Sequence, residues 1–131
     1  MAEIEQMIKL IMAVILSGLI GYEREKSHKP AGLRTHVVVC IGATLLTIIS
    51  VDYFFEDNAR LVSALVTGLG FLGAGAIIAS GRDIKGMTTA ATIWFVAMVG
   101  IGVGIGWYQL SAMATIIVFI LLVLGRFEKI S

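Results

Sequence analysis

The chain has 131 residues, of which 58% are hydrophobic and 15% are charged, and its formal net charge is +1. The apolar residues form long runs that a soluble protein of this length could not bury, which excludes a soluble single domain. Its basic residues do not alternate with aromatic ones, so nucleic acid is not an expected partner. Runs of about 20 residues match the roughly 30 Å hydrocarbon core of a bilayer. The sequence therefore predicts an all-α, polytopic membrane protein.

Five membrane spans are predicted within one transmembrane domain, residues 1–131. They cover about residues 4–22, 33–53, 61–79, 87–106 and 110–124. Pro30, the only proline, prevents the first helix from continuing into the second. The stretch Gly102–Gln109 is interpreted as a break between the last two spans, with one long bent helix as the alternative. No cleavable signal peptide is expected, because the first apolar run follows two glutamates rather than a basic segment.

Basic residues gather on one side of this topology. The loop after the first span, the turn after the third and the C-terminal tail carry eight of them: Arg24, Lys26, Lys29, Arg34, Arg82, Lys85, Arg126 and Lys129. Only Lys9 and Arg60 fall on the other side. Because cytoplasmic loops carry an excess of lysine and arginine, this pattern predicts a cytoplasmic C-terminus and an N-terminus outside.

The third and fourth spans are rich in glycine. Six glycines are expected to let helices pack closely: Gly68, Gly70, Gly73, Gly75, Gly100 and Gly104. The run from Gly68 to Gly73 also fits the dinucleotide pattern G-x-G-x-x-G. That pattern requires a preceding strand and a βαβ unit, which a membrane span does not provide. We therefore interpret the run as a packing surface.

The candidate functional site is a polar cluster at the cytoplasmic edge. Its members come from the first loop and from the starts of the second and fourth spans: Glu23, Arg24, Arg34, Thr35, His36, Asp83, Thr88 and Thr89. Glu23, Glu25 and Asp83 could supply oxygen ligands to a cation, with magnesium as the ion considered. The alternative is a solvated set of ion pairs that only fixes the topology.

The two helix starts in this cluster allow a second interpretation. Exposed N–H groups at Arg34–His36 and Thr88–Thr89 favour anions, whereas simple capping by threonine hydroxyls is the plainer alternative. His36 could titrate as a switch or be held by hydrogen bonds. Cys40 is expected to be a small buried apolar residue. The sequence contains no nucleophile–base–acid set and no metal signature, so no catalytic residue is assigned and an enzyme is not expected.

Four stretches together resemble the MgtC/SapB membrane protein family. They are Gly21–Glu25 (GYERE), Lys29–His36 (KPAGLRTH), Gly68–Ile78 (GLGFLGAGAII) and Ile84–Trp94 (IKGMTTAATIW). The resemblance implies a bacterial inner-membrane protein tied to magnesium homeostasis. Family members have been linked to growth at low magnesium, survival in hosts and restraint of the F-type ATP synthase.

The resemblance has two departures. Many family members add a soluble C-terminal domain that resembles an ACT fold, whereas this chain stops soon after its last span, so it is either a short member or part of a longer chain. Ala64 stands where the family pattern leads us to expect glutamine.

Two functions remain open from the sequence. The preferred one is a non-enzymatic regulator that acts through membrane-protein partners, for which the F-type ATP synthase is a candidate. The alternative is a small transporter or channel for magnesium, protons or an organic anion. Because five helices leave little room for a pathway, a homo-oligomer, with a dimer favoured, is expected.

Overall fold

The computed structural model describes residues 2–79, 81 and 84–128. Over this part of the chain it contains five α-helices, a short 3-10 helix η1 (Phe55–Asp57) and no strand. The helices are α1 (Ala2–Lys26), α2 (Leu33–Asp52), α3 (Asn58–Ala79), α4 (Ile84–Gly104) and α5 (Tyr108–Glu128). All five are long and apolar enough to cross a membrane. The predicted all-α, multi-pass membrane protein is therefore confirmed.

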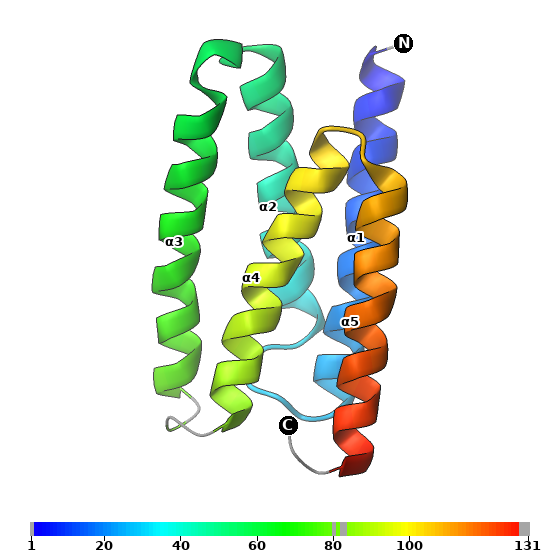
Figure 1. The fold of residues 1–131 in the computed structure, drawn as a ribbon, viewed down its shortest axis with the longest axis vertical. Coiled ribbons are helices and arrows are strands. Elements are labelled where there is room, and N and C mark those ends of the chain that lie inside the picture. The colour runs from blue at the N-terminus through cyan, green and yellow to red at the C-terminus, as the bar shows by residue number, and fades with distance from the viewer. Residues whose placement is uncertain (1, 80, 82–83, 129–131) are drawn as a thin grey trace.

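The helices alternate in direction along the chain, and the start of α1 and the end of α5 lie at opposite ends of the bundle (Figure 1). α4 is the central helix, because it packs against α1, α2, α3 and α5. α3 lies at one edge, where it contacts α4 and, less extensively, α2. The core is thus built around α1, α2 and α4, with α3 and α5 on its flanks.

The first helix is longer than the sequence analysis predicted. The stretch from Glu23 to Lys26, expected as a loop, is the last turn of α1. Glutamate, arginine and lysine are good helix formers, and nothing before Pro30 interrupts the helix. The helix ends where the Lys29 amide donates to the Arg24 carbonyl at 3.0 Å and His28 adopts a positive φ of 57°. This extension carries Glu23 and Arg24 on a rigid helix.

The stretch after α4 is a true break rather than a bend. Gly106 has a φ of 89°, and its amide donates to the Val103 carbonyl at 2.9 Å. The Trp107 amide donates to the Gly102 carbonyl, also at 2.9 Å. This pair of hydrogen bonds around a left-handed glycine ends a helix in the Schellman manner. The chain then reverses into α5.

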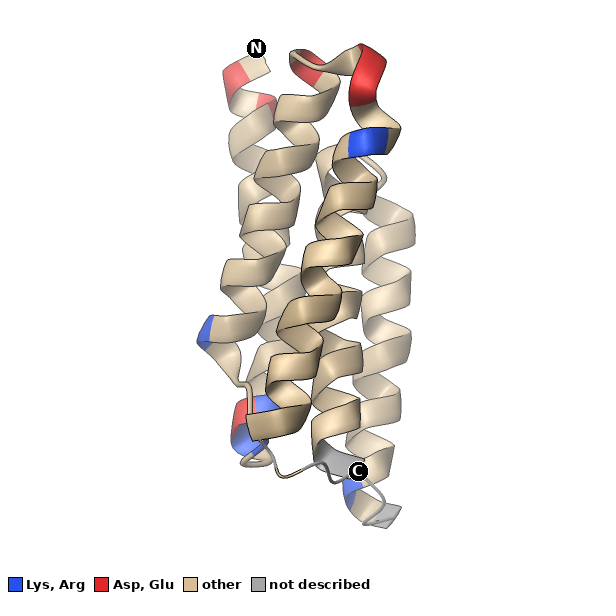
Figure 2. Cartoon of the chain, turned by 90° about the vertical axis from the view of Figure 1, so that its left-hand side faces the viewer, with Lys and Arg blue, Asp and Glu red and all other residues tan. Residues whose placement is uncertain are grey.

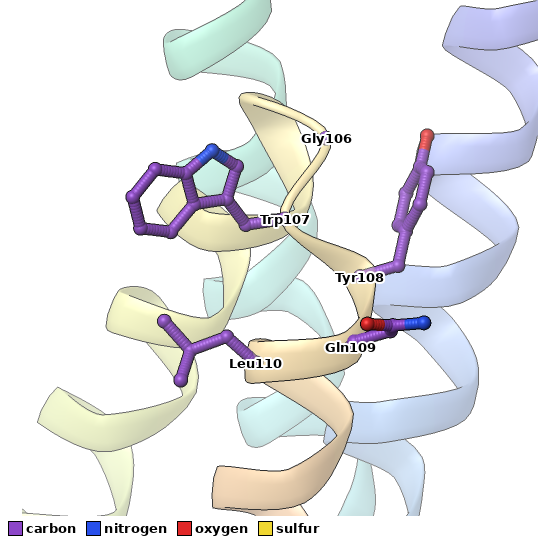
Figure 3. A pocket seen from close by; sticks show the side chains of 5 residues that line it. All are labelled: Gly106, Trp107, Tyr108, Gln109 and Leu110. Atoms are coloured by element: carbon purple, nitrogen blue, oxygen red, sulfur yellow. The ribbon is translucent and has the colours of Figure 1, made fainter.

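The turn between α4 and α5 forms a shallow hollow lined by five consecutive residues, 106–110. Figure 3 shows the Trp107 and Leu110 side chains on one side of the turn and the Tyr108 ring on the side of α1. Trp107 is exposed. Amphipathic aromatic side chains are typical of the boundary between hydrocarbon and water, and we interpret the hollow as part of that boundary.

The predicted packing glycines have two kinds of surroundings. A Cβ atom at Gly100 would lie 2.6 Å from the carbonyl oxygen of Cys40, and one at Gly104 would lie 2.6 Å from the Thr47 Cβ. The α2 and α4 backbones can therefore cross closely only because both residues are glycine. At Gly73 a Cβ would meet the Ala90 Cβ at 3.4 Å.

The other three glycines lie on exposed positions of α3. A Cβ atom built at Gly68, Gly70 or Gly75 meets no atom of the structure within 4 Å. Within the described part of one chain, no helix packs against these three positions, and the close approach that we expected there is not made.

Charged residues separate to the two ends of the bundle (Figure 2). One end carries acidic residues from the start of α1 and from the α2–α3 connection, together with Arg60. The other end carries Arg24, Lys26 and Arg126, with Glu23 and Glu25 among them. We call these the acidic end and the basic end. The candidate site lies at the basic end.

Candidate functional site

Glu23 is the centre of a buried ion cluster at the basic end. Glu23 is 1% exposed although it lies only three residues before the end of α1. One oxygen accepts from Arg24 Nε at 3.0 Å. The other accepts from the Ser27 hydroxyl at 2.9 Å and lies 3.3 Å from Arg126 Nε. Two guanidinium groups and a hydroxyl thus compensate one buried carboxylate.

Arg24 is completely buried and only partly satisfied. Its Nε binds Glu23, but Nη1 and Nη2 have no hydrogen-bond partner among the described residues. The Arg126 side chain, which approaches Glu23 from α5, is 37% exposed. One carboxylate and two guanidinium groups give this cluster a formal charge of +1.

His36 is buried at the foot of α2, next to the same cluster. Its Nδ1 lies 2.8 Å from the Gly32 carbonyl oxygen, and its Nε2 lies 2.8 Å from the Thr92 hydroxyl. A carbonyl oxygen can only accept, so Nδ1 carries a proton. Nε2 pairs with the Thr92 hydroxyl, whose single proton goes either to Nε2 or to the Thr89 carbonyl oxygen 3.0 Å away. Both ring nitrogens are therefore held in place, and this bond joins α2 to α4.

The threonines of the predicted site are placed differently from one another. Thr89 is buried, and its hydroxyl has no hydrogen-bond partner among the described residues. Its carbonyl oxygen lies 3.0 Å from the Thr92 hydroxyl, one step from His36. Thr88 is half-buried, and Thr35 lines a groove between α3 and the Pro30–Ala31 turn. Of the three, Thr89 belongs to the buried cluster.

Glu25 and Arg34 lie outside this cluster. Glu25 accepts a hydrogen bond from the Leu33 amide at 3.1 Å and so caps the start of α2. A Cβ at Gly32 would lie 2.6 Å from the same carboxylate oxygen, so this cap requires glycine there. Arg34 is exposed beside an apolar groove between α1 and α2, lined in part by Val14.

The predicted cation site is not assembled from the described residues. Glu23 and Glu25 are consecutive acids on α1, yet one faces the buried cluster and the other caps α2. Asp83, the third proposed ligand, lies outside the described residues. Within the part that is described, no three acidic, histidine or cysteine side chains come together as a metal site would require.

Three members of the cluster were missed by the sequence analysis: Ser27, Thr92 and Arg126. Thr92 lies one turn after Thr88, on a helix start that the analysis had already recognised, and its spacing could have revealed it. Arg126 comes from the end of α5, and no local pattern links it to Glu23.

A second set of buried polar side chains extends from the cluster toward the acidic end. The hydroxyls of Ser17, Thr44, Thr47 and Thr115 each donate to the carbonyl oxygen four residues earlier, at 2.5–2.9 Å. These local bonds satisfy the hydroxyls inside an apolar bundle. Cys40, which is fully buried among them, is a free thiol.

Comparison with known proteins places the chain among its relatives. The sequence pattern of the MgtC family matches residues 10–129. The chain is 40% identical to the "Putative magnesium transporter YhiD" of Escherichia coli K12, over 97% of this chain and 62% of that protein. It is 38% identical to "Protein MgtC" of Salmonella typhimurium, over 85% of this chain and 48% of that protein.

A third relative, "Protein MgtC" of Brucella abortus, is 40% identical over 81% of this chain and 45% of its own length. The chain therefore spans about half to two-thirds of the length of the curated relatives that it matches. No solved structure matches it.

Proposed function

We propose a regulatory role for this chain, which belongs to the MgtC family. In this proposal the protein sits in the bacterial inner membrane, is not an enzyme, and contributes to magnesium homeostasis by binding another membrane protein or a second copy of itself. The link to magnesium rests on the printed name of a relative, the "Putative magnesium transporter YhiD".

The observation that carries the proposal is the exposed surface of α3. Only 11% of the residues in its membrane window are buried, against 50% in α4. Its exposed surface holds Gly68 and Gly75 on one side of the helix and Gly70 on the other, and a Cβ atom at any of them would meet no atom within 4 Å. Small residues at a helix surface allow close contact with another transmembrane helix, which is how membrane helices associate. The exposed surface of α3 therefore suits a partner helix.

The interior of a single chain favours a regulator over a channel. The α2–α4 crossing is closed at Gly100, whose missing side chain leaves only enough room for the Cys40 carbonyl. The buried hydroxyls beyond it already donate to their own helices. A permeant ion would have to break these bonds to cross the bundle at this point.

The charge distribution supports one orientation. We propose that the basic end lies in the cytoplasm, in accord with the excess of lysine and arginine in cytoplasmic loops. The candidate site at Glu23 would then be reached from the cytoplasm. A cysteine accessibility assay on intact cells, with single cysteines at Lys26 and Arg60, tests this. If the Lys26→Cys variant is labelled from outside the cell, the orientation is the reverse of the one proposed.

Co-purification from native membranes tests the regulatory proposal. The wild-type chain is expected to bring down a specific membrane protein, or a second copy, in fixed stoichiometry. Gly70→Leu, which adds a side chain on the exposed surface of α3, is expected to reduce that recovery, whereas Ile117→Leu on the exposed side of α5 should leave it unchanged. Recovery of the wild-type chain alone, with no growth defect at low magnesium on deletion, would overturn the proposal.

A transporter is the second candidate, because of the name of the relative quoted above. In that case a homo-oligomer, with a dimer favoured, would have to build the pathway between protomers. Purified protein in liposomes should then pass magnesium or protons down a gradient, and Glu23→Gln should alter the rate. Absence of flux for both ions would exclude this alternative and leave the regulator.

A further inference from the structure

The guanidinium group of Arg24 offers two donors that nothing in the described chain accepts. Its side chain is fully buried, and Glu23 takes only the Nε hydrogen. Nη1 and Nη2 have no hydrogen-bond partner among the described residues. These two groups point the same way and match the spacing of two oxygens on one oxyanion. A buried charged donor without an acceptor is costly, so we expect an acceptor to bind at Nη1 and Nη2 of Arg24.

Thr89 supplies a second, independent donor. Its hydroxyl is fully buried and also lacks a hydrogen-bond partner among the described residues. Thr89 is joined to His36 through the Thr92 hydroxyl. The charges of Arg24 and Glu23 act on the same imidazole. The two incompletely bonded side chains, Arg24 on α1 and Thr89 on α4, are therefore both connected to His36.

The charge of the cluster points to an anion. Glu23 contributes one negative charge, whereas Arg24 and Arg126 contribute two positive charges. The two fully buried charges, Glu23 and Arg24, cancel, so the excess positive charge is that of Arg126 at the partly exposed edge of the cluster, where it favours an anion. Arg126 is partly exposed, so the cluster lies next to the surface of the basic end. An anion would enter there without crossing the bundle.

We propose that Arg24 and Thr89 form a binding site for a phosphate group, either free phosphate or the phosphate of a lipid headgroup. Two Nη donors and one hydroxyl call for three oxygens, which a phosphate has and a carboxylate lacks. The site deepens the proposed regulatory function, since it would give the regulator a ligand. Binding is measured on the purified chain alone, so failure of the site and failure of the partner proposal are separate results.

The experiment titrates inorganic phosphate into the detergent-purified full chain, by calorimetry and by thermal unfolding, against chloride at equal ionic strength. The wild type is expected to bind and to unfold at a higher temperature with phosphate. Thr89→Val should weaken binding about tenfold, the effect of one hydrogen bond to a charged group. Arg24→Lys should weaken it further, because it loses the paired donors. Arg60→Gln, exposed at the acidic end, is the matched control and should bind as the wild type does.

A second arm places the same variants in nanodiscs containing phosphatidic acid or only phosphatidylcholine. Stabilisation by phosphatidic acid that Thr89→Val reduces, without binding of free phosphate, identifies a lipid headgroup as the source and supports the site. If Arg24→Lys does not fold, Thr89→Val carries the test, since its hydroxyl has no hydrogen bond within the described chain to lose.

Three results would overturn the proposal. The first is no effect of phosphate in either arm. The second is wild-type affinity in Thr89→Val. The third is binding that appears only in Asp83→Asn, which would mean that a carboxylate of the chain itself occupies the Arg24 edge.

Discussion

α3 and α4 are built from similar residues and lie in opposite surroundings. Both are apolar enough to span a membrane and both contain several glycines. On α4, Gly100 and Gly104 face α2 so closely that any side chain would clash with it. On α3, a Cβ atom at Gly68, Gly70 or Gly75 would meet no atom within 4 Å. A glycine-rich helix therefore indicates a surface that another helix can approach closely. Only the fold shows whether that other helix belongs to the same chain.

The same contrast separates two functions of the bundle. The ion cluster of Glu23 joins α1 to α5, and the His36–Thr92 hydrogen bond beside it joins α2 to α4. α3 contributes one side to the core and leaves the rest of its surface for lipid or for a partner. The following changes test this division, beginning with the one expected to have the largest effect.

Removal of the Glu23 charge should have the largest effect. Glu23→Gln leaves Arg24 buried without its counterion, and breaking a buried ion pair from one side costs about 3–5 kcal/mol. Chemical unfolding in detergent micelles measures the loss. Glu5→Gln is the control on the same helix, because its ion pair with Lys9 is exposed on the glutamate side and should contribute little. Equal stability of the two variants would contradict a buried ion centre.

The second largest effect is expected from adding a side chain where α2 and α4 cross. Gly100→Ala places a methyl group 2.6 Å from the carbonyl oxygen of Cys40, and a backbone atom cannot move aside as a side chain does. We expect a loss of about 3 kcal/mol, at the upper end of the usual cost of overpacking. Gly70→Ala on α3 makes the same chemical change in open space. Thermal unfolding of both variants decides the point, and an unaffected Gly100→Ala would mean that the two helices lie farther apart.

Removal of the His36–Thr92 hydrogen bond, which joins α2 to α4 at the basic end, should have a smaller effect. Thr92→Val keeps the shape of the side chain and removes the hydroxyl that pairs with His36 Nε2 at 2.8 Å. Leaving that nitrogen without a partner should cost about 1–2 kcal/mol. Thr67→Val, whose exposed hydroxyl bonds only to its own helix, is the control. Histidine NMR should also show a changed ring environment in Thr92→Val alone.

The smallest effect on the folded chain is expected on α3. Gly70→Leu should raise the unfolding free energy of the protomer by no more than about 1 kcal/mol, the gain in helix propensity, because a Cβ atom there meets no other atom within 4 Å. Its effect should appear in association instead, as a lower yield of crosslinked complex. A large loss of protomer stability would show that this side of α3 is buried within the chain.

The helices were predictable from the sequence because each apolar run alone is long enough to cross a membrane. Their ends were less so, since Glu23–Lys26 are polar and also good helix formers, which is why a predicted loop proved to be helix. A break within Gly102–Gln109 was predicted, and the structure places it at Gly106, whose positive φ a glycine adopts without steric cost.

The candidate site was predictable only in part. Glu23, Arg24, His36 and Thr89 were named from the sequence and lie in one buried region. Glu25, only two residues from Glu23, points elsewhere because a helix turns about 200° in two residues. Arg126 reaches Glu23 only because α5 packs against α1, a long-range contact that no local pattern encodes.

Photo-crosslinking from the surface of α3 is the most direct test of the central claim that this helix meets a partner in the membrane. A photoreactive amino acid is placed at Phe71, which is 86% exposed on α3, and at Ile117, which is 57% exposed on α5. In native membranes the account predicts one discrete crosslinked product from position 71 and none from position 117. Crosslinks to lipid alone at both positions would contradict it.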